Sequence, residues 1–121
     1  MIKNILLVGA GGFLGSIARY LIAVLMKGQG TMTFPWATLA ANVLGCLLIG
    51  LLWAAFNRYS NSQLDLLLVT GFCGGFTTFS TFSRESLVLL QSGNYALFTA
   101  YALGSIVLGL LAVIAGFAIA K

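Results

Sequence analysis

The sequence predicts an all-α membrane protein whose chain crosses the bilayer four times. The chain has 121 residues, of which 60% are hydrophobic and only 7% are charged, and its mean hydropathy is +1.07. Soluble domains carry about 25% charged residues, and a chain this short has too much surface to hide so much apolar area from water. Four apolar segments each reach the roughly 20 residues that a membrane-spanning helix needs.

The four predicted spans form a single transmembrane domain over residues 1–121. They cover about residues 5–26, 36–56, 64–90 and 95–120. A turn over residues 27–33 follows the first span, and Pro35 stands near the start of the second, where proline is tolerated. Polar turns over residues 57–63 and 91–94 separate the remaining spans. The first span is too long for a removable signal peptide, and no small-residue cleavage pattern follows it.

The charged residues exclude one class of partner and say little about orientation. The net charge is +4, but the basic residues are scattered and form no face or run, so nucleic-acid binding is not expected. Four spans place both termini on one side, together with Lys3, Arg58 and Lys121, against Lys27 on the other. This weak positive-inside bias favours cytoplasmic termini and leaves insertion in both orientations open.

Several kinds of chemistry lack the residues they require. The chain has no histidine and no acidic cluster, so neither a transition-metal site nor a catalytic nucleophile–base pair can be built, and we expect no enzyme. Cys46 and Cys73 lie inside apolar spans, which favours two small buried side chains over a disulfide.

Glycines in the first span imitate a dinucleotide-binding loop. After Gly9 and Gly11, the third glycine of the pattern falls at Gly15, one residue late, and no acidic residue follows about 20 positions later, where the ribose would need one. Gly11 and Gly15 are four residues apart, which is the spacing of a small-residue face that lets two helices approach closely. We therefore predict a helix-packing face.

The third span contains a stretch unlike the rest of the chain, from Gly71 to Ser83. It holds two adjacent glycines, Gly74 and Gly75, and five hydroxyl side chains. Irregular backbone at membrane depth survives only where protein or a water-filled cavity covers it. We therefore predict that the third helix is broken near Gly74–Thr78 and that the break belongs to a site, most simply an ion path.

Helical spacing sorts this stretch into three rows that we expect to run past the break. The rows are Phe76, Phe79 and Phe82; Thr77, Ser80 and Arg84; and Thr78, Thr81 and Glu85. Hydroxyls that bond back to the preceding turn and plain aromatic packing are the alternative explanations. The combination with adjacent glycines and a buried acid favours the path.

Polar residues in the other spans have two open readings each. Arg19 can extend to the interface, or it can line an aqueous vestibule and attract anions. Asn42, on one helical face with Thr38 and Gly45, can join two helices or donate hydrogen bonds in a pore.

Tyr101 and Ser105 share a face of the fourth span and can pack or line a path.

Glu85 need not pair with Arg84, because neighbours on a helix point about 100° apart. Arg19 or hydroxyl groups are its candidate partners.

The motif Gly71-Phe-Cys-Gly-Gly-Phe-Thr-Thr-Phe-Ser-Thr-Phe-Ser-Arg-Glu strongly resembles the signature of the Fluc (CrcB) fluoride channels. Three further matches agree: Gly11-Gly-Phe-Leu-Gly-Ser-Ile-Ala-Arg-Tyr, Thr38-Leu-Ala-Ala-Asn-Val-Leu-Gly-Cys, and Tyr101 with Ser105. The resemblance covers the whole chain, including its length and span count.

The resemblance implies an antiparallel, dual-topology homodimer with two pores that exports fluoride passively across the bacterial cytoplasmic (inner) membrane and limits its toxicity. The fluoride path that it implies is lined by Asn42, Phe79, Ser80, Thr81, Phe82, Ser83, Tyr101 and Ser105. Arg19 matches the family's first-span arginine, and we assign Arg19 and Glu85 to the vestibule. Backbone carbonyls of Gly74 and Thr77, paired across the dimer axis, are implied to hold a structural sodium ion.

The hydrogen-bond donors of these residues are compatible with a fluoride channel, but they do not by themselves identify the anion. Amide and hydroxyl groups replace the water around a small anion without a fixed charge that would trap it, and phenyl rings present positive edges. Alone, these residues predict only a path for a small anion or polar solute. The alternatives are a coupled exporter, of the fluoride/proton or small-multidrug type, and a non-transporting membrane protein.

Overall fold

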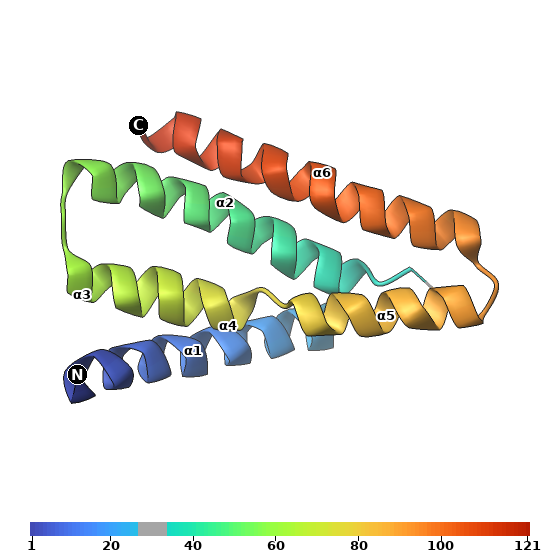
Figure 1. Ribbon diagram of the computed structural model, residues 1–121, viewed down its shortest axis with the longest axis horizontal. Helices are drawn as coiled ribbons and strands as arrows, with labels where there is room; N and C mark the ends of the chain where they lie inside the picture. Colours follow the sequence, from blue (N-terminus) through green and yellow to red (C-terminus); the bar gives the residue numbers. More distant parts are fainter. Residues whose placement is uncertain (27–33) are drawn as a thin grey trace.

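The computed structural model describes residues 1–26 and 34–121, all of them in helices or short connections (Figure 1). The helices are α1 (Ile2–Met26), α2 (Trp36–Arg58), α3 (Ser62–Asp65), the π-helix η1 (Leu66–Cys73), α4 (Gly74–Phe76), α5 (Phe79–Gln91) and α6 (Tyr95–Ala120). Four helical segments are long and apolar enough to cross a membrane: Ile2–Met26, Trp36–Arg58, Ser62–Gln91 and Tyr95–Ala120. This confirms the predicted all-helical class and the four spans; the turn predicted over 27–33 lies outside the described residues.

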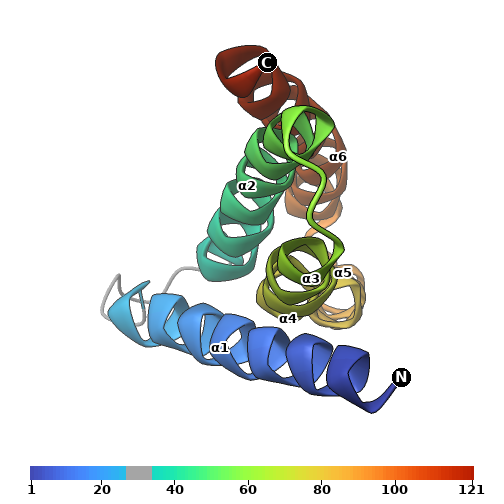
Figure 2. The same ribbon diagram turned by 90° about the vertical axis from the view of Figure 1, so that its left-hand side faces the viewer.

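The spans associate as two pairs of helices (Figures 1 and 2). Helices α2 and α6 lie side by side and run in the same direction, while α1 lies against η1 and α4, also in parallel. Both termini lie at the same end of the bundle (Figure 1). There Arg58, at the end of α2, donates a hydrogen bond to the Ala120 carbonyl at the end of α6.

Glycines allow α1 to touch the third span backbone to backbone. A Cβ added at Gly11 would lie 2.1 Å from the Leu67 carbonyl oxygen, and one at Gly15 would lie 2.2 Å from that of Phe72. Both glycines are buried inside α1. The helix-packing interpretation of this motif is confirmed, and the dinucleotide loop is excluded because no loop exists there.

Glycines also allow α2 and α6 to pack backbone to backbone. A Cβ at Gly50 would lie 2.2 Å from the Val113 carbonyl oxygen, and one at Gly116 would lie 2.3 Å from that of Leu47. Such small-residue contacts replace the hydrophobic effect, which does not drive helices together in lipid.

Local signals explain where the helices begin and end. Asn61 caps α3, because its Oδ1 accepts hydrogen bonds from the backbone N–H groups of Gln63 and Leu64, each at 3.1 Å. Gly93 follows the end of α5 with a φ of 78°, a left-handed conformation that favours glycine. Pro35 immediately precedes α2.

Most large apolar side chains of the described residues point outward. The buried cluster is small and consists of Leu39, Leu89 and Tyr101, with partly buried neighbours that include Phe82 and Val43. Exposed leucine, isoleucine and valine side chains cover the outer faces of α1 and α6. An apolar exterior around a small core is the distribution expected of a protein solvated by lipid.

Candidate functional site

The third span changes backbone conformation at Thr77 and Thr78, which we call the linker. Helix α4 ends at Phe76; Thr77 has φ −89° and ψ 155°, Thr78 has φ −149° and ψ 122°, and α5 begins at Phe79. Thr78 is the N-cap of α5, and its Oγ1 accepts a hydrogen bond of 3.2 Å from the Thr81 N–H. Gly74 and Gly75 themselves remain helical.

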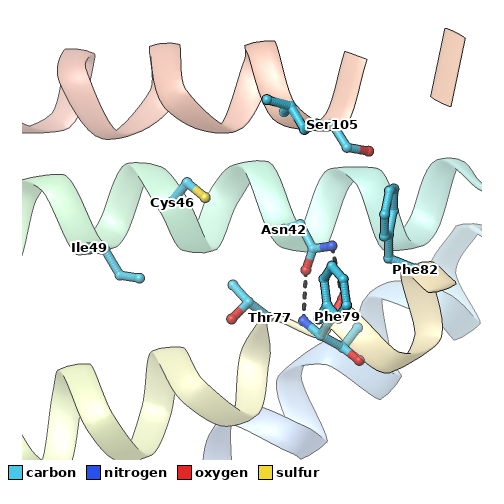
Figure 3. Close-up of a pocket in the computed structure, with 9 residues that line it drawn as sticks. Asn42, Cys46, Ile49, Thr77, Phe79, Phe82 and Ser105 are labelled. Carbon is cyan, nitrogen blue, oxygen red and sulfur yellow. Dashed lines mark hydrogen bonds between the residues drawn. The ribbon is translucent and has the colours of Figure 1, made fainter. Parts of the chain in front are cut away.

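Asn42 binds the linker from α2. Its Nδ2 donates to the Thr78 carbonyl oxygen at 3.2 Å, and its Oδ1 accepts from the Thr78 N–H at 2.8 Å (Figure 3). The amide therefore satisfies both backbone groups of one extended residue in an apolar span. One of the two Nδ2 hydrogens is used in this way, which leaves the other for a ligand.

The linker releases backbone carbonyls from helical pairing, those of Gly74 and Thr77 among them. In an unbroken α-helix the Thr78 N–H would bind the Gly74 carbonyl and the Thr81 N–H would bind that of Thr77. Both donors are engaged elsewhere, with Asn42 Oδ1 and with Thr78 Oγ1 respectively. The carbonyl of Gly75, between them, accepts from Arg19 Nε at 3.2 Å.

An open groove of about 300 Å³ runs beside the linker (Figure 3). It is lined by Asn42, Cys46, Ile49, Thr77, Thr78, Phe79, Phe82, Ser105 and Ile106. Four residues that the sequence assigned to a path, Asn42, Phe79, Phe82 and Ser105, therefore lie together although they come from three separate helices.

Two side chains of the groove have polar or aromatic surface free to contact a ligand. The Ser105 hydroxyl is buried yet has no hydrogen-bond partner among the described residues, and such a group is costly unless something binds it. Phe79 is 78% exposed at the groove's edge. Phe82 is held more firmly, because its ring lies 5.0 Å from that of Tyr101.

A second cavity of about 340 Å³ lies between α1, α2 and α5. It is lined by Ser16, Arg19, Tyr20, Ala23, Ala37, Thr38, Thr81 and Glu85. Arg19, Thr81 and Glu85 of the predicted site thus line a cavity separate from the groove. The Nε of Arg19 is bound inward to the Gly75 carbonyl oxygen; the aqueous vestibule stays a prediction.

Tyr101 contacts one residue of the groove and one residue of the second cavity. Its ring is fully buried beside Phe82, and its hydroxyl donates to Glu85 Oε1 at 3.0 Å. Of the partners considered for Glu85, a hydroxyl is therefore the one found.

The predicted rows hold only within α5, because the extended linker interrupts the helical phase. Phe76 leaves the phenylalanine row and stacks on Phe72, with ring centroids 5.7 Å apart. Thr77 Oγ1 bonds back to the Cys73 carbonyl at 2.8 Å. Ser80 and Ser83 are exposed on the outer face of α5 and line neither cavity.

Thr78, which the sequence placed in a polar row but not among the residues of the path, is the centre of the hydrogen-bond network. Its Oγ1 donates to Thr81 Oγ1 at 3.1 Å and lies 3.4 Å from Ser80 Oγ. A threonine just before the Phe79–Gln91 helix is a capping signal that could have identified it. Thr38 of the second cavity was on the Asn42 face but was not assigned to the site.

Residues 6–117 match the family model described as "CrcB-like protein, Camphor Resistance (CrcB)". The chain belongs to the CrcB family. It is 51% identical over 115 residues to the fluoride-specific ion channel FluC of Phocaeicola vulgatus, a match that covers 94% of this chain and 95% of that protein. It is 47% identical over 118 residues to FluC of Bacteroides fragilis (94% and 93% covered), and 46% identical over 123 residues to FluC of Chlorobaculum tepidum (100% and 97%).

Because this CrcB family match covers nearly the whole chain, it includes every element that builds the groove, the linker and the second cavity. The signature quoted from the third span coincides with the part of the structure where the backbone leaves helical geometry.

Proposed function

We propose that this chain is a fluoride-selective channel through which fluoride leaves the cell passively across the bacterial cytoplasmic membrane, and that it is not an enzyme. The observation that carries the proposal is the identity of 46–51% to relatives named fluoride-specific ion channels, over 94% or more of this chain. The multi-pass helical architecture and the donor-lined groove are compatible with it.

The groove offers what a small, strongly hydrated anion requires. Asn42 keeps one free amide hydrogen, and the unpartnered Ser105 hydroxyl can donate. These donors replace water without a fixed positive charge that would hold the ion in place. The rings of Phe79 and Phe82, with centroids 5.8 Å apart, can present their positive edges to an anion. Ser80, Thr81, Ser83 and Tyr101 are proposed to extend this path along α5 and α6.

A structural sodium ion fits the released carbonyls of Gly74 and Thr77. Backbone carbonyl oxygens suit a hard cation, and a broken membrane helix frees such oxygens to coordinate ions. The neighbouring Gly75 and Thr78 carbonyls already accept hydrogen bonds from Arg19 and Asn42. Gly74 is exposed in the protomer, and a sodium ion there would neutralise the partial negative charge of the two oxygens.

An antiparallel homodimer of dual topology is the proposed assembly. One protomer leaves Gly74, Ser80 and Ser83 exposed within an apolar span. Polar groups at this depth require cover from protein or water, and a second copy supplies it. Dual topology predicts that single cysteines at Asn61 and Ser92, at opposite ends of the third span, each label in part with an impermeant maleimide on intact cells. Complete labelling of one and none of the other would exclude it.

Liposomes test the function directly. Purified protein in vesicles loaded with potassium fluoride should release fluoride within seconds of adding a potassium ionophore, as an ion-selective electrode records. Chloride-loaded vesicles should retain their anion. Equal release of both anions, or no release of either, contradicts the proposal.

A coupled exporter is the alternative. The first span has Arg19 where small multidrug exporters carry a coupling carboxylate, which leaves Glu85 as the candidate coupling acid. Coupling predicts that an imposed proton gradient drives fluoride uphill at zero membrane potential. A channel predicts no net movement under that condition.

A further inference from the structure

Arg84 is a charged side chain within an apolar span, outside both the groove and the second cavity. It is exposed in the protomer and lies seven residues before the end of α5 at Gln91, roughly 10 Å along the helix axis. Charged side chains at such depth are costly in lipid, and they generally face protein or water along an ion path.

No carboxylate of the protomer is placed to neutralise Arg84. The chain has two acidic residues, Asp65 and Glu85. Glu85 accepts a hydrogen bond from Tyr101 and lines the second cavity, and its side chain leaves α5 about 100° away from that of Arg84. Asp65 lies nineteen residues earlier, roughly 30 Å along the span. The positive charge of Arg84 is therefore uncompensated.

Arg84 shares its exposed face with two hydroxyls. Ser80 lies four residues before Arg84 and three residues before Ser83, so its side chain is the neighbour of both on the surface of α5. We call these three residues the serine face. Helical side chains lean toward the helix N-terminus, which directs the guanidinium of Arg84 back toward Ser80. Ser80 Oγ in turn lies 3.4 Å from Thr78 Oγ1 in the linker.

We propose that Arg84 is an anion-attracting site that concentrates fluoride at the outer end of the serine face and delivers it toward the linker. The proposal rests on the proposed function. A guanidinium offers a permanent charge and five N–H donors, and an uncompensated charge in a low-dielectric wall raises the local concentration of a counter-ion. The serine hydroxyls then continue the series of donors inward.

The test compares Arg84→Gln, Arg84→Lys and wild-type protein in fluoride-loaded vesicles. Arg84→Gln should lower the initial efflux rate about tenfold at low ionic strength, the lower end of what electrostatic focusing supplies. The difference should shrink in about 1 M potassium gluconate, where the screening length falls to about 3 Å. Arg84→Lys should keep most of the rate. Lys3→Gln removes an exposed charge in the first turn of α1 and is the matched control.

Three results would overturn the proposal. The first is wild-type conduction by Arg84→Gln at every ionic strength. The second is equally slow efflux from Arg84→Lys and Arg84→Gln with no dependence on salt, which indicates a structural role. The third is the same loss in Asp65→Asn, which indicates that Arg84 pairs with the Asp65 of a second copy. If wild-type protein itself releases no fluoride, the proposed function fails first and this inference falls with it.

Discussion

Asn42 and Thr78, thirty-six residues apart in the chain, are joined by two hydrogen bonds, of 2.8 and 3.2 Å. The pair resembles a short stretch of β-ladder in which a side-chain amide replaces the second strand. Because lipid offers no hydrogen bonds to the backbone of Thr78, the amide makes an extended residue tolerable inside the bilayer. Asn42 thus both supports the linker and lines the groove.

Replacement of Asn42 should therefore affect stability and transport together. Asn42→Ala leaves the N–H and carbonyl of Thr78 without partners, and each buried unsatisfied group costs about 1–3 kcal/mol. We expect a lower melting temperature in detergent and loss of fluoride efflux. Asn57→Ala, at an exposed position near the end of α2, is the control and should change neither.

Asn42→Asp separates the two roles. A carboxylate still accepts from the Thr78 N–H, but it cannot donate to the carbonyl, and its charge repels fluoride. The variant should fold and fail to conduct. Wild-type efflux from Asn42→Asp would show that the groove does not carry the anion.

Phe79→Ile and Phe82→Ile should reduce fluoride efflux, because an aliphatic side chain has no positive edge to present to an anion. Phe79 is 78% exposed in the protomer, so its replacement should leave the protomer's packing intact. Phe82 packs on Tyr101, so its replacement should also lower the melting temperature somewhat. Phe13→Ile on the outer face of α1 is the matched control; if it slows efflux as much as Phe79→Ile, the effect is general.

Sodium should stabilise the assembled protein if the released carbonyls of Gly74 and Thr77 bind it. A ligand that binds only the folded state, present at a hundred times its dissociation constant, adds about 2.7 kcal/mol. Exchange of sodium for N-methylglucamine should therefore lower the melting temperature, and titration with sodium should restore it. An identical melting temperature in both cations would remove the sodium site from the proposal.

Gly50→Ala should destabilise the α2–α6 pair, because the new Cβ would lie 2.2 Å from the Val113 carbonyl oxygen. Overpacking of this kind costs about 1–3 kcal/mol. Gly104→Ala is the matched control within the same pair. A Cβ there meets no atom within 4 Å, so the change should be neutral or stabilising by up to about 1 kcal/mol. Equal effects of the two substitutions would contradict the packing argument.

The sequence by itself determined the class of the protein and the number of its spans. Length, a charged fraction of 7% and four apolar segments leave no soluble fold that could bury the apolar area. The spacing of Gly11 and Gly15 also predicted a close helix contact correctly, because a four-residue repeat describes one face of a helix without reference to its neighbours.

Periodicity was less reliable wherever the helix stops. The rows predicted through the third span assume a constant 100° per residue, and two extended residues reset that phase, which separates Phe76 from Phe79. Adjacent glycines weaken a helix by only about 1 kcal/mol each. The close helix packing that Gly75 permits offsets this loss of helix stability, since a Cβ there would lie 2.6 Å from the Gly12 carbonyl oxygen.

Only the tertiary structure decided which partner each polar residue takes. Composition left Asn42 between joining helices and donating in a pore, and left Glu85 between Arg19 and a hydroxyl. The structure pairs Asn42 with Thr78 and Glu85 with Tyr101. The pattern of residues along one helix determines the face of that helix on which a side chain lies. The hydrogen bond that the side chain makes depends on how the four helices are positioned relative to one another. Close backbone contacts determine these relative positions here, at Gly11, Gly15, Gly50 and Gly116.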